Sequence, residues 1–599
     1  MFTPELIDTA RARVAGVTGI SLPFPVDVSR GEGLSVTLRD GAARIEADGV
    51  NSLSRGFFLL SRCVREGRTA CDIRQHRAIA SCGAMADVSR NAVLKPDAVR
   101  RLIDRLAALG MNLLLLYTED TFEVPGYPYL GHLRGRYSLD DLRAFDDYAA
   151  AAGIELVPCI QTLGHMEQFL QWQHNHPLRD QPDILLIDDD EVYRFIEAEI
   201  AAMRSCVRSR RIHIGMDEAH GVGFGQYHLM HGDVNRFELL SRHLSRVLDI
   251  CGRHDFMPMM WSDMFFRLGS RQNDYYDEHA VIPQDVIDHM PHVDLCYWDY
   301  YHQDEAFYDR MLREHRRMGR ETVFAGGNWV WAGFLPHVKK TEATMLPALR
   351  ACIGHGVQTV FCALWGDDGA ETNLFLAANR LPLFSEFCWQ GADCPMEEIE
   401  RAGECLTGLP DPAFRAMGEF FPDESDLCTG KQLIWCDLLL PLTYETGDPP
   451  DAVIRRCTAA RGMLTRYEGR EDCRYAALLF DIVLTKAPVI RDLRSRYLAG
   501  DRAYLAFVAG KIIPGLIGLY EQLERAHRAL WERDMKRLGW EVLCLRYGAV
   551  RARLLDVQDE ISRYLVGSLE RIEALDEQPL PVGGDRLFYR QLVSSSVHV

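Results

Sequence analysis

The chain has 599 residues, 47% of them hydrophobic, and a formal net charge of -19. This length exceeds that of one domain and predicts two to four domains around a large apolar core. The acidic balance excludes nucleic acid and anionic membranes as expected partners, because both require a basic patch and none is visible. A neutral or cationic small substrate fits better.

The cysteines and the apolar segments indicate a cytoplasmic protein. Seventeen cysteines are scattered without C-x-x-C pairs, which is typical of reduced core residues rather than of disulfides or a zinc site. The amino terminus has no basic segment followed by an apolar core, and we expect no apolar run that approaches a membrane span. We therefore expect no metal and no membrane partner.

Residues 1–76 predict a small α/β domain. Helical segments at 4–15 and 52–66 flank strand-like alternation at 34–38 and 43–47,. No residue in this region suggests chemistry.

From residue 77 a strand, a loop and a helix repeat in turn. The predicted strands cover 79–85, 112–117, 154–160, 211–214, 258–261, 293–298, 322–325 and 359–363. Eight strands alternating with helices predict a (β/α)8 TIM barrel over residues 77–391. An open doubly wound sheet is the alternative, but no G-x-G-x-x-G turn follows a strand, which argues against a dinucleotide site.

Residues 392–599 predict an α-helical carboxy-terminal domain. Apolar residues recur at helical spacing over 450–467, 473–496, 503–530 and 541–576,. This domain could pack over the barrel mouth, form a homodimer or only shield surface, and the sequence leaves these alternatives open.

The stretch Arg211–His220 contains the most informative residues. Asp217 and Glu218 are adjacent, directly after a buried strand that stops at Gly215. Two neighbouring carboxylates are costly to bury, because like charges raise one pKa unless something separates their roles. Their place after a barrel strand indicates a catalytic site.

Aromatic residues gather after the last four predicted strands. They are Trp261 after strand five, Trp298, Tyr300 and Tyr301 after strand six, Trp329 and Trp331 after strand seven, and Trp365 after strand eight, where Asp367 follows. A pyranose sugar requires such surroundings, because indoles stack on the apolar faces of its ring and carboxylates accept hydrogen bonds from its hydroxyl groups.

Several motifs resemble those of the family-20 glycoside hydrolases, the β-N-acetylhexosaminidases. His213–Glu218 is similar to the His-x-Gly-x-Asp-Glu signature of that family, and Asp87–Arg90, Leu163–His165 and Trp365–Asp367 resemble its other motifs in the same order. The helical carboxy-terminal region resembles that of a divergent bacterial branch. The resemblance implies a TIM barrel behind a small α/β domain.

The resemblance also implies substrate-assisted hydrolysis, in which the 2-acetamido oxygen of the substrate attacks the anomeric carbon. Glu218 is then the general acid and Asp217 the anion that orients the acetamido group. His165 is expected in a relay with Glu119 or Asp120. A tyrosine bonds the acetamido oxygen, and the sequence leaves Tyr300 or Tyr301 for this role.

The remaining expected contacts are those of the substrate pocket. The resemblance assigns its walls to Trp261, Trp298, Trp329 and Trp365, and assigns to Asp367 the outer hydroxyls of the sugar. Two departures concern the side of the 4-hydroxyl: Asp367 replaces the usual glutamate, and the expected alignment places Cys82 where the family has a sugar-binding arginine. A pocket that accepts both glucosamine and galactosamine epimers is the hypothesis.

The sequence thus predicts an exo-acting, retaining β-N-acetylhexosaminidase without cofactor or metal, which acts on small oligosaccharides or glycoconjugates. An enzyme similar to the O-linked N-acetylglucosaminidases, with the same mechanism, is one alternative. A sugar-binding barrel without catalysis is the other, and replacement of Glu218 would separate a binder from an enzyme.

Overall fold

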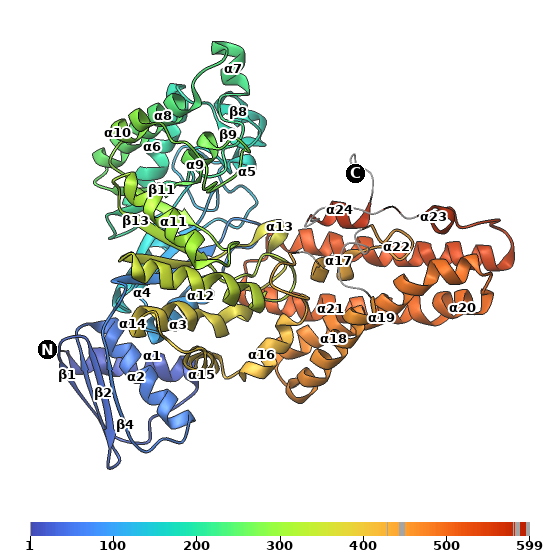
Figure 1. Cartoon of the computed structure of the whole chain (residues 1–599), viewed down its shortest axis with the longest axis horizontal. Helices are drawn as coiled ribbons and strands as arrows, with labels where there is room; N and C mark the ends of the chain where they lie inside the picture. The colour runs from blue at the N-terminus through green and yellow to red at the C-terminus, as the bar shows by residue number, and fades with distance from the viewer. Residues whose placement is uncertain (1, 428, 443–449, 579, 581–587, 595–599) are drawn as a thin grey trace.

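The computed structural model describes residues 2–427, 429–442, 450–578, 580 and 588–594. A small amino-terminal sheet lies below a barrel, and a lobe of long helices projects from one side of the barrel (Figure 1). The element order therefore follows the three regions expected from the sequence.

The amino-terminal region is a four-stranded sheet covered by two helices. Its elements are α1 (Pro4–Thr18), β1 (Val26–Arg30), β2 (Leu34–Arg39), β3 (Ala42–Ala47), α2 (Val50–Arg65) and β4 (Cys71–Gln75), in the sheet order β1-β3-β2-β4. Sequence patterns missed β1 and β4. Both are edge strands, and β1 has no fully buried residue, so alternation there is weak.

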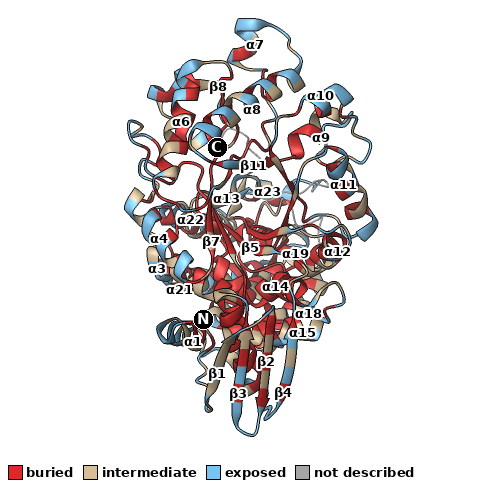
Figure 2. Ribbon diagram, turned by 90° about the vertical axis from the view of Figure 1, so that its left-hand side faces the viewer, coloured by how far each residue is buried: buried red, intermediate tan, exposed pale blue. Residues whose placement is uncertain are grey.

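The predicted barrel is confirmed. Eight parallel strands close in the order β10-β11-β12-β13-β14-β5-β6-β7. They are β5 (Ser81–Asp87), β6 (Leu113–Tyr117), β7 (Glu155–Cys159), β10 (Arg211–His213), β11 (Met257–Trp261), β12 (Asp294–Trp298), β13 (Thr322–Gly327) and β14 (Thr359–Leu364). Their apolar runs fill the interior, and Figure 2 shows these strands buried at the centre of the molecule,.

Helices surround the barrel and alternate with its strands. The longer ones are α3 (Pro96–Ala108), α4 (Leu139–Ala151), α6 (Asp190–Arg204), α8 (Arg236–Arg253), α11 (Glu305–Arg317), α12 (Val338–Gly354) and α14 (Leu381–Gln390). Shorter elements occupy the loops at the mouth, among them the hairpin of β8 (Arg179–Gln181) and β9 (Ile184–Leu185), α9 (Asp263–Gly269) and α13 (Asp367–Ala370). The barrel mouth is thus built largely from loops.

The described residues beyond Gln390 contain helices and no strand. The principal ones are α15 (Met396–Thr407), α16 (Asp411–Gly418), α17 (Thr429–Trp435), α18 (Pro450–Leu464), α19 (Glu471–Leu498), α20 (Arg502–Phe507), α21 (Ile513–Asp534) and α22 (Trp540–Val566). Their apolar faces pack on one another, and α19 lies against both α18 and α21.

One sequence expectation about apolar segments is wrong. The continuous helix Arg502–Asp534 is long and apolar enough to cross a membrane, by length and composition only, and 33% of its most apolar window is buried. Lys511 is the one charged residue between positions 503 and 520. The apolar segment was overlooked in the sequence because Gly and Pro residues interrupt its apolar pattern.

Both flanking regions are anchored to the barrel by polar contacts. Arg55 of α2 forms a fully buried ion pair with Glu386 of α14 (2.8 Å). On the other side, the connection between α21 and α22 reaches the barrel mouth, where Met535 bridges to Leu94 after β5. The helical region therefore touches the edge at which barrel enzymes carry their sites.

Candidate active site

The segment after β10 has the irregular backbone that two adjacent acids require. Gly215, Met216 and Glu218 have φ angles of 69°, 71° and 51°, so Asp217 and Glu218 need not point to opposite faces as in a strand. A Cβ on Gly215 would lie 2.1 Å from Oε1 of Gln161. This position therefore requires glycine. Left-handed conformations at non-glycine residues are strained and cluster at functional sites.

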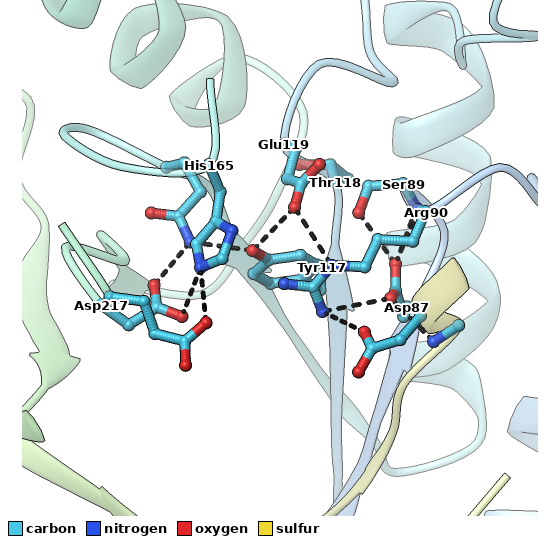
Figure 3. A network of polar contacts seen from close by, with 12 residues as sticks. Asp87, Ser89, Arg90, Tyr117, Thr118, Glu119, His165 and Asp217 are labelled. Carbon is cyan, nitrogen blue, oxygen red and sulfur yellow. Dashed lines mark hydrogen bonds and ion pairs between the residues drawn. The ribbon is translucent and has the colours of Figure 1, made fainter. Parts of the chain in front are cut away.

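Asp217 is held as an anion by two neighbours (Figure 3). Nε2 of His165 lies 3.2 Å from one of its oxygens, and the amide of Gln161 donates to the other at 2.7 Å. Burial alone would raise the pKa of Asp217, but His165 and Gln161 lower it to about 2,. The same pairing outweighs burial at His165 and raises its pKa to about 9.

Glu218 has the opposite electrostatic environment although it is the next residue. Burial raises its pKa, the His165 cation opposes this, and the Asp217 anion adds to it. Its backbone N–H donates to Asp263 (2.9 Å), its carboxylate lies 3.5 Å from His165, and 35% of its side chain is exposed at the mouth. One acid is thus fixed as an anion and the other is favoured as a proton donor.

The expected relay between His165 and an acid of strand two is only partly supported. Asp120 faces Arg134 (3.4 Å) instead of His165, which excludes it. Glu119 interacts with the charge of His165, but its carboxylate accepts from Tyr117 (3.0 Å). Burial, opposed by the nearby Arg90, raises the pKa of Glu119 to about 7. We call His165, Asp217, Glu218 and Glu119 the acid wall.

Gln161 is a site residue that the sequence analysis missed. Its amide N–H group donates to Asp217 and to Tyr117 (2.8 Å), and its oxygen accepts from the backbone of Met216 (3.1 Å). It therefore holds the irregular backbone and the anion together. Its place at the end of β7, two residues after the strand, was the available signal.

The expected alignment of Cys82 with a sugar-binding arginine is wrong. Cys82 is the second residue of β5, is buried, and lies at the end of the strand away from the mouth. Arg90 follows the carboxyl end of β5 and lies 2.9 Å from Asp367 and 3.6 Å from Glu119. It also packs over the ring of Trp365 (4.6 Å). Arg90 therefore supplies a cation beside Asp367, on the side of the site where the sequence alignment predicted none.

The four predicted tryptophans come together. Trp261, Trp298, Trp329 and Trp365 lie at the carboxyl ends of β11 to β14 and are at most 8% exposed. The indoles of Trp261 and Trp365 are 6.1 Å apart, and Trp329 stacks on Trp331 at 4.0 Å. We call Trp261, Trp298, Trp329 and Trp365 the aromatic wall.

Tyr300 and Tyr301 lie between the two walls. The hydroxyl of Tyr300 accepts from the indole N–H of Trp365 (2.9 Å), and its ring stacks on Trp298 (5.5 Å). Tyr301 is 45% exposed. Asp367 and Glu218 both act electrostatically on the two tyrosines, which places the tyrosine hydroxyls near these two acids.

His165, Asp217 and Glu218 also have the donor types of a metal site, with their ligand atoms within 4.8 Å of one another. The ion pair between His165 and Asp217 brings these groups together, and the pairing raises the pKa of His165 to about 9 in spite of burial.

Two family models match the chain. The catalytic domain of glycosyl hydrolase family 20 matches residues 80–283, and the glycoside hydrolase 20C C-terminal domain matches residues 431–593. The first match contains the acid wall and the second contains α18 to α22.

Two proteins that are similar in sequence to this chain carry the name hexosaminidase D. Hexosaminidase D of Bos taurus is 27% identical over 242 residues, which cover 38% of this chain and 63% of that protein. Hexosaminidase D of Homo sapiens is 28% identical over 166 residues, which cover 26% and 34%. The matches thus span less than two thirds of either relative.

Solved structures share the fold. A GH20 exo β-N-acetylglucosaminidase from Vibrio harveyi superimposes with a TM-score of 0.50 at 15% identity, over 68% of this chain and 73% of that one. The chitobiase of Flavobacterium johnsoniae superimposes with a TM-score of 0.51 at 14% identity, over 88% and 93%.

Proposed function

We propose, from the premise that this chain belongs to glycoside hydrolase family 20, that it is an exo-acting, retaining β-N-acetylhexosaminidase. The observation that carries the proposal is the pair of adjacent acids with opposite pKa shifts, Asp217 and Glu218, opposite the aromatic wall. Its substrates are terminal β-linked N-acetylglucosamine or N-acetylgalactosamine residues of oligosaccharides or glycoconjugates.

The first step breaks the glycosidic bond. The acetamido oxygen of the substrate forms a bond to the anomeric carbon, while Glu218 gives its proton to the leaving glycosidic oxygen, which departs with the bonding electron pair. Burial raises the pKa of Glu218 and so favours the protonated carboxyl group that this step requires,. The product of this step is a cyclic oxazolinium ion on the sugar.

The second step reverses the roles. The carboxylate of Glu218 takes a proton from water, and the resulting hydroxide opens the oxazolinium ring at the anomeric carbon. Two inversions retain the β configuration. Asp217, anionic throughout, accepts the acetamido N–H and offsets the positive charge of the ring. His165 and Gln161 hold Asp217 in this state.

The remaining side chains of the site recognise the rest of the sugar. The hydroxyl of Tyr300 is the donor proposed for the acetamido oxygen, with Tyr301 beside it, and the aromatic wall stacks on the apolar ring face. Arg90 and Asp367, 2.9 Å apart, form the charged group for the outer hydroxyls. Because the arginine is present, acceptance of both epimers rests on the shorter Asp367 alone.

Glu218→Gln against wild type on a chromogenic N-acetyl-β-glucosaminide tests the proposal. Loss of a general acid predicts a fall in kcat of about 10²–10⁴-fold with ligand binding retained. Glu238→Gln, an exposed glutamate on α8, is the matched control and should keep wild-type activity. A wild-type protein that binds the sugar without hydrolysing it would instead be a sugar-binding barrel.

We also propose a cytoplasmic location and a homodimer. The first is supported by the cysteines, because fifteen of the sixteen described are buried and none of these sixteen forms a disulfide,. The second is supported by apolar side chains exposed on neighbouring helices, Phe507 on α20 and Leu545 and Leu555 on α22,. Subcellular fractionation tests the location. Sedimentation of a variant with serine at these three positions tests the dimer.

A further inference from the structure

The loop after β14 has a backbone that its own sequence does not favour. Asp368, Gly369 and Ala370 have φ angles of 52°, 98° and 54° in succession. Left-handed conformations cost roughly 1–2 kcal/mol at a residue with a Cβ atom, so contacts from outside must hold this loop. It directly follows Asp367, whose carboxylate pairs with Arg90 in the site.

The contacts that hold the loop come from the helical carboxy-terminal region. Lys431 of α17 lies 2.8 Å from Asp368 and 3.1 Å from Glu371. Arg546 of α22 lies 2.9 Å from Asp368 and 2.7 Å from Glu371, and it also donates to the backbone oxygen of Asp368 (2.8 Å). The indole of Trp435 donates to Glu371 (2.7 Å).

Lys431, Arg546, Asp368 and Glu371 form a buried set of four charged groups. The side chains of Lys431 and Glu371 are 1% exposed, and those of Arg546 and Asp368 are 11% exposed. Two cations balance two carboxylates, and buried charges of this kind are strongly destabilised when one partner is removed. The set therefore fixes the loop more firmly than surface ion pairs would.

We propose that Lys431 and Arg546 are positioning residues, through which the carboxy-terminal region sets Asp367 against Arg90 and so determines recognition of the sugar's 4-hydroxyl. The inference rests on the proposed function and assigns a task to the helical region. Neither cation contacts the substrate. Both act one residue away from the carboxylate that does.

The geometry separates this effect from the acid wall. Asp217 and Glu218 follow β10, whereas Asp367 follows β14, and the loop held by Lys431 and Arg546 belongs to β14 alone. Loosening that loop moves Asp367 while His165, Asp217 and Glu218 keep their contacts. A rise in KM and a loss of 4-hydroxyl recognition, with kcat little changed, are the expected signature.

The experiment compares Arg546→Met with Arg553→Met in the full chain. Arg553 lies on the same helix but pairs with Asp437 and Asp556, away from the barrel loop. Each variant is assayed with nitrophenyl N-acetyl-β-glucosaminide and with its 4-deoxy analogue. The ratio of the two kcat/KM values measures how strongly the 4-hydroxyl is recognised.

Arg546→Met should raise KM by about tenfold, leave kcat within about threefold, and bring the ratio between the two substrates close to one. Asp367→Ala should have the same effect on the ratio. Arg553→Met should keep the wild-type ratio. Arg546→Lys, which keeps both cations of the set, should restore part of the ratio.

An unchanged ratio in an active, folded Arg546→Met variant would overturn the inference and leave the proposed function intact. A wild-type protein without hydrolase activity would overturn both. If circular dichroism shows that Arg546→Met does not fold, Asp368→Asn and Arg546→Lys carry the same comparison, and wild-type ratios in both would equally reject the positioning role.

Discussion

The two walls of the barrel mouth are built on opposite physical principles. The acid wall has strained backbone at Glu119, His165 and Glu218, and its side chains are joined by charge and hydrogen bonds. The aromatic wall packs through ring contacts, as in the stacking of Trp329 on Trp331. Electrostatic arrangement defines one wall and shape defines the other.

This difference suggests a division of labour between reaction and recognition. Proton transfer and charge stabilisation depend on the pKa values of the acids. In the acid wall the pKa of Asp217 is lowered and that of Glu218 is raised, although the two residues are adjacent,. Binding of a sugar face depends on a rigid apolar surface, which the aromatic wall supplies. Substitutions in the two walls should therefore produce different kinetic signatures.

Among the further substitutions in the two walls, the largest effect after that of Glu218→Gln is expected for Asp217→Asn in the acid wall. Loss of the anion removes the partner of the acetamido N–H and of the oxazolinium charge, so kcat should fall by about 10²–10³-fold, or roughly 2.7–4 kcal/mol. KM should change little. Steady-state kinetics on a chromogenic N-acetylglucosaminide measures both, and a rise in KM at constant kcat would place Asp217 in recognition.

An intermediate effect is expected in the aromatic wall, for Trp298→Ala. Removal of the indole should raise KM by about tenfold, because aromatic stacking contributes on the order of 1 kcal/mol beyond the area that it buries. The pH dependence of kcat should not move, since Trp298 carries no charge. A displaced pH profile would show that the two walls are not independent.

The smallest effect is expected for His165→Gln, as a shift of the pH profile. The His165 cation lowers the pKa of both Asp217 and Glu218, so its removal raises both. Activity requires ionised Asp217 on the acid limb and protonated Glu218 on the basic limb. Both limbs should therefore move to higher pH, by roughly one unit or about 1.4 kcal/mol.

The pH profile of kcat measures this shift. His213→Gln is unsuitable as a control, because the imidazole of His213 packs on Trp261 inside the barrel. His228→Gln, on the exposed α7 (Gln226–His231), is a better match. Limbs that stay in place, or that move to lower pH, would contradict the ion pairing at His165.

The sequence predicted those parts of the fold and site that depend on local pattern. The barrel strands are apolar runs of the right length, and the tryptophans were found because the residue after each strand could be counted. The edge strands β1 and β4 escaped notice because they bury few residues,.

Other parts depend on strand bounds or on contacts distant in the chain. Cys82 was mistaken for the position of the arginine because the start and the end of β5 could not be told apart without the structure, whereas Arg90 lies beyond its end. The place of Gln161 after β7 was visible in the sequence, but its role becomes clear only once the backbone after β10 is known. Lys431 and Arg546 meet Asp368 from 63 and 178 residues away, and no local pattern announces such contacts.

The account's central claim is that the sugar's own acetamide makes the attack while Asp217 and Glu218 assist it. The most direct measurement compares kcat/KM of the wild-type protein for nitrophenyl N-acetyl-β-glucosaminide and for the matching glucoside with a 2-hydroxyl group. The account predicts a loss of at least about 10³-fold for the glucoside, because an oriented intramolecular nucleophile is removed. Comparable rates for the two substrates would contradict it.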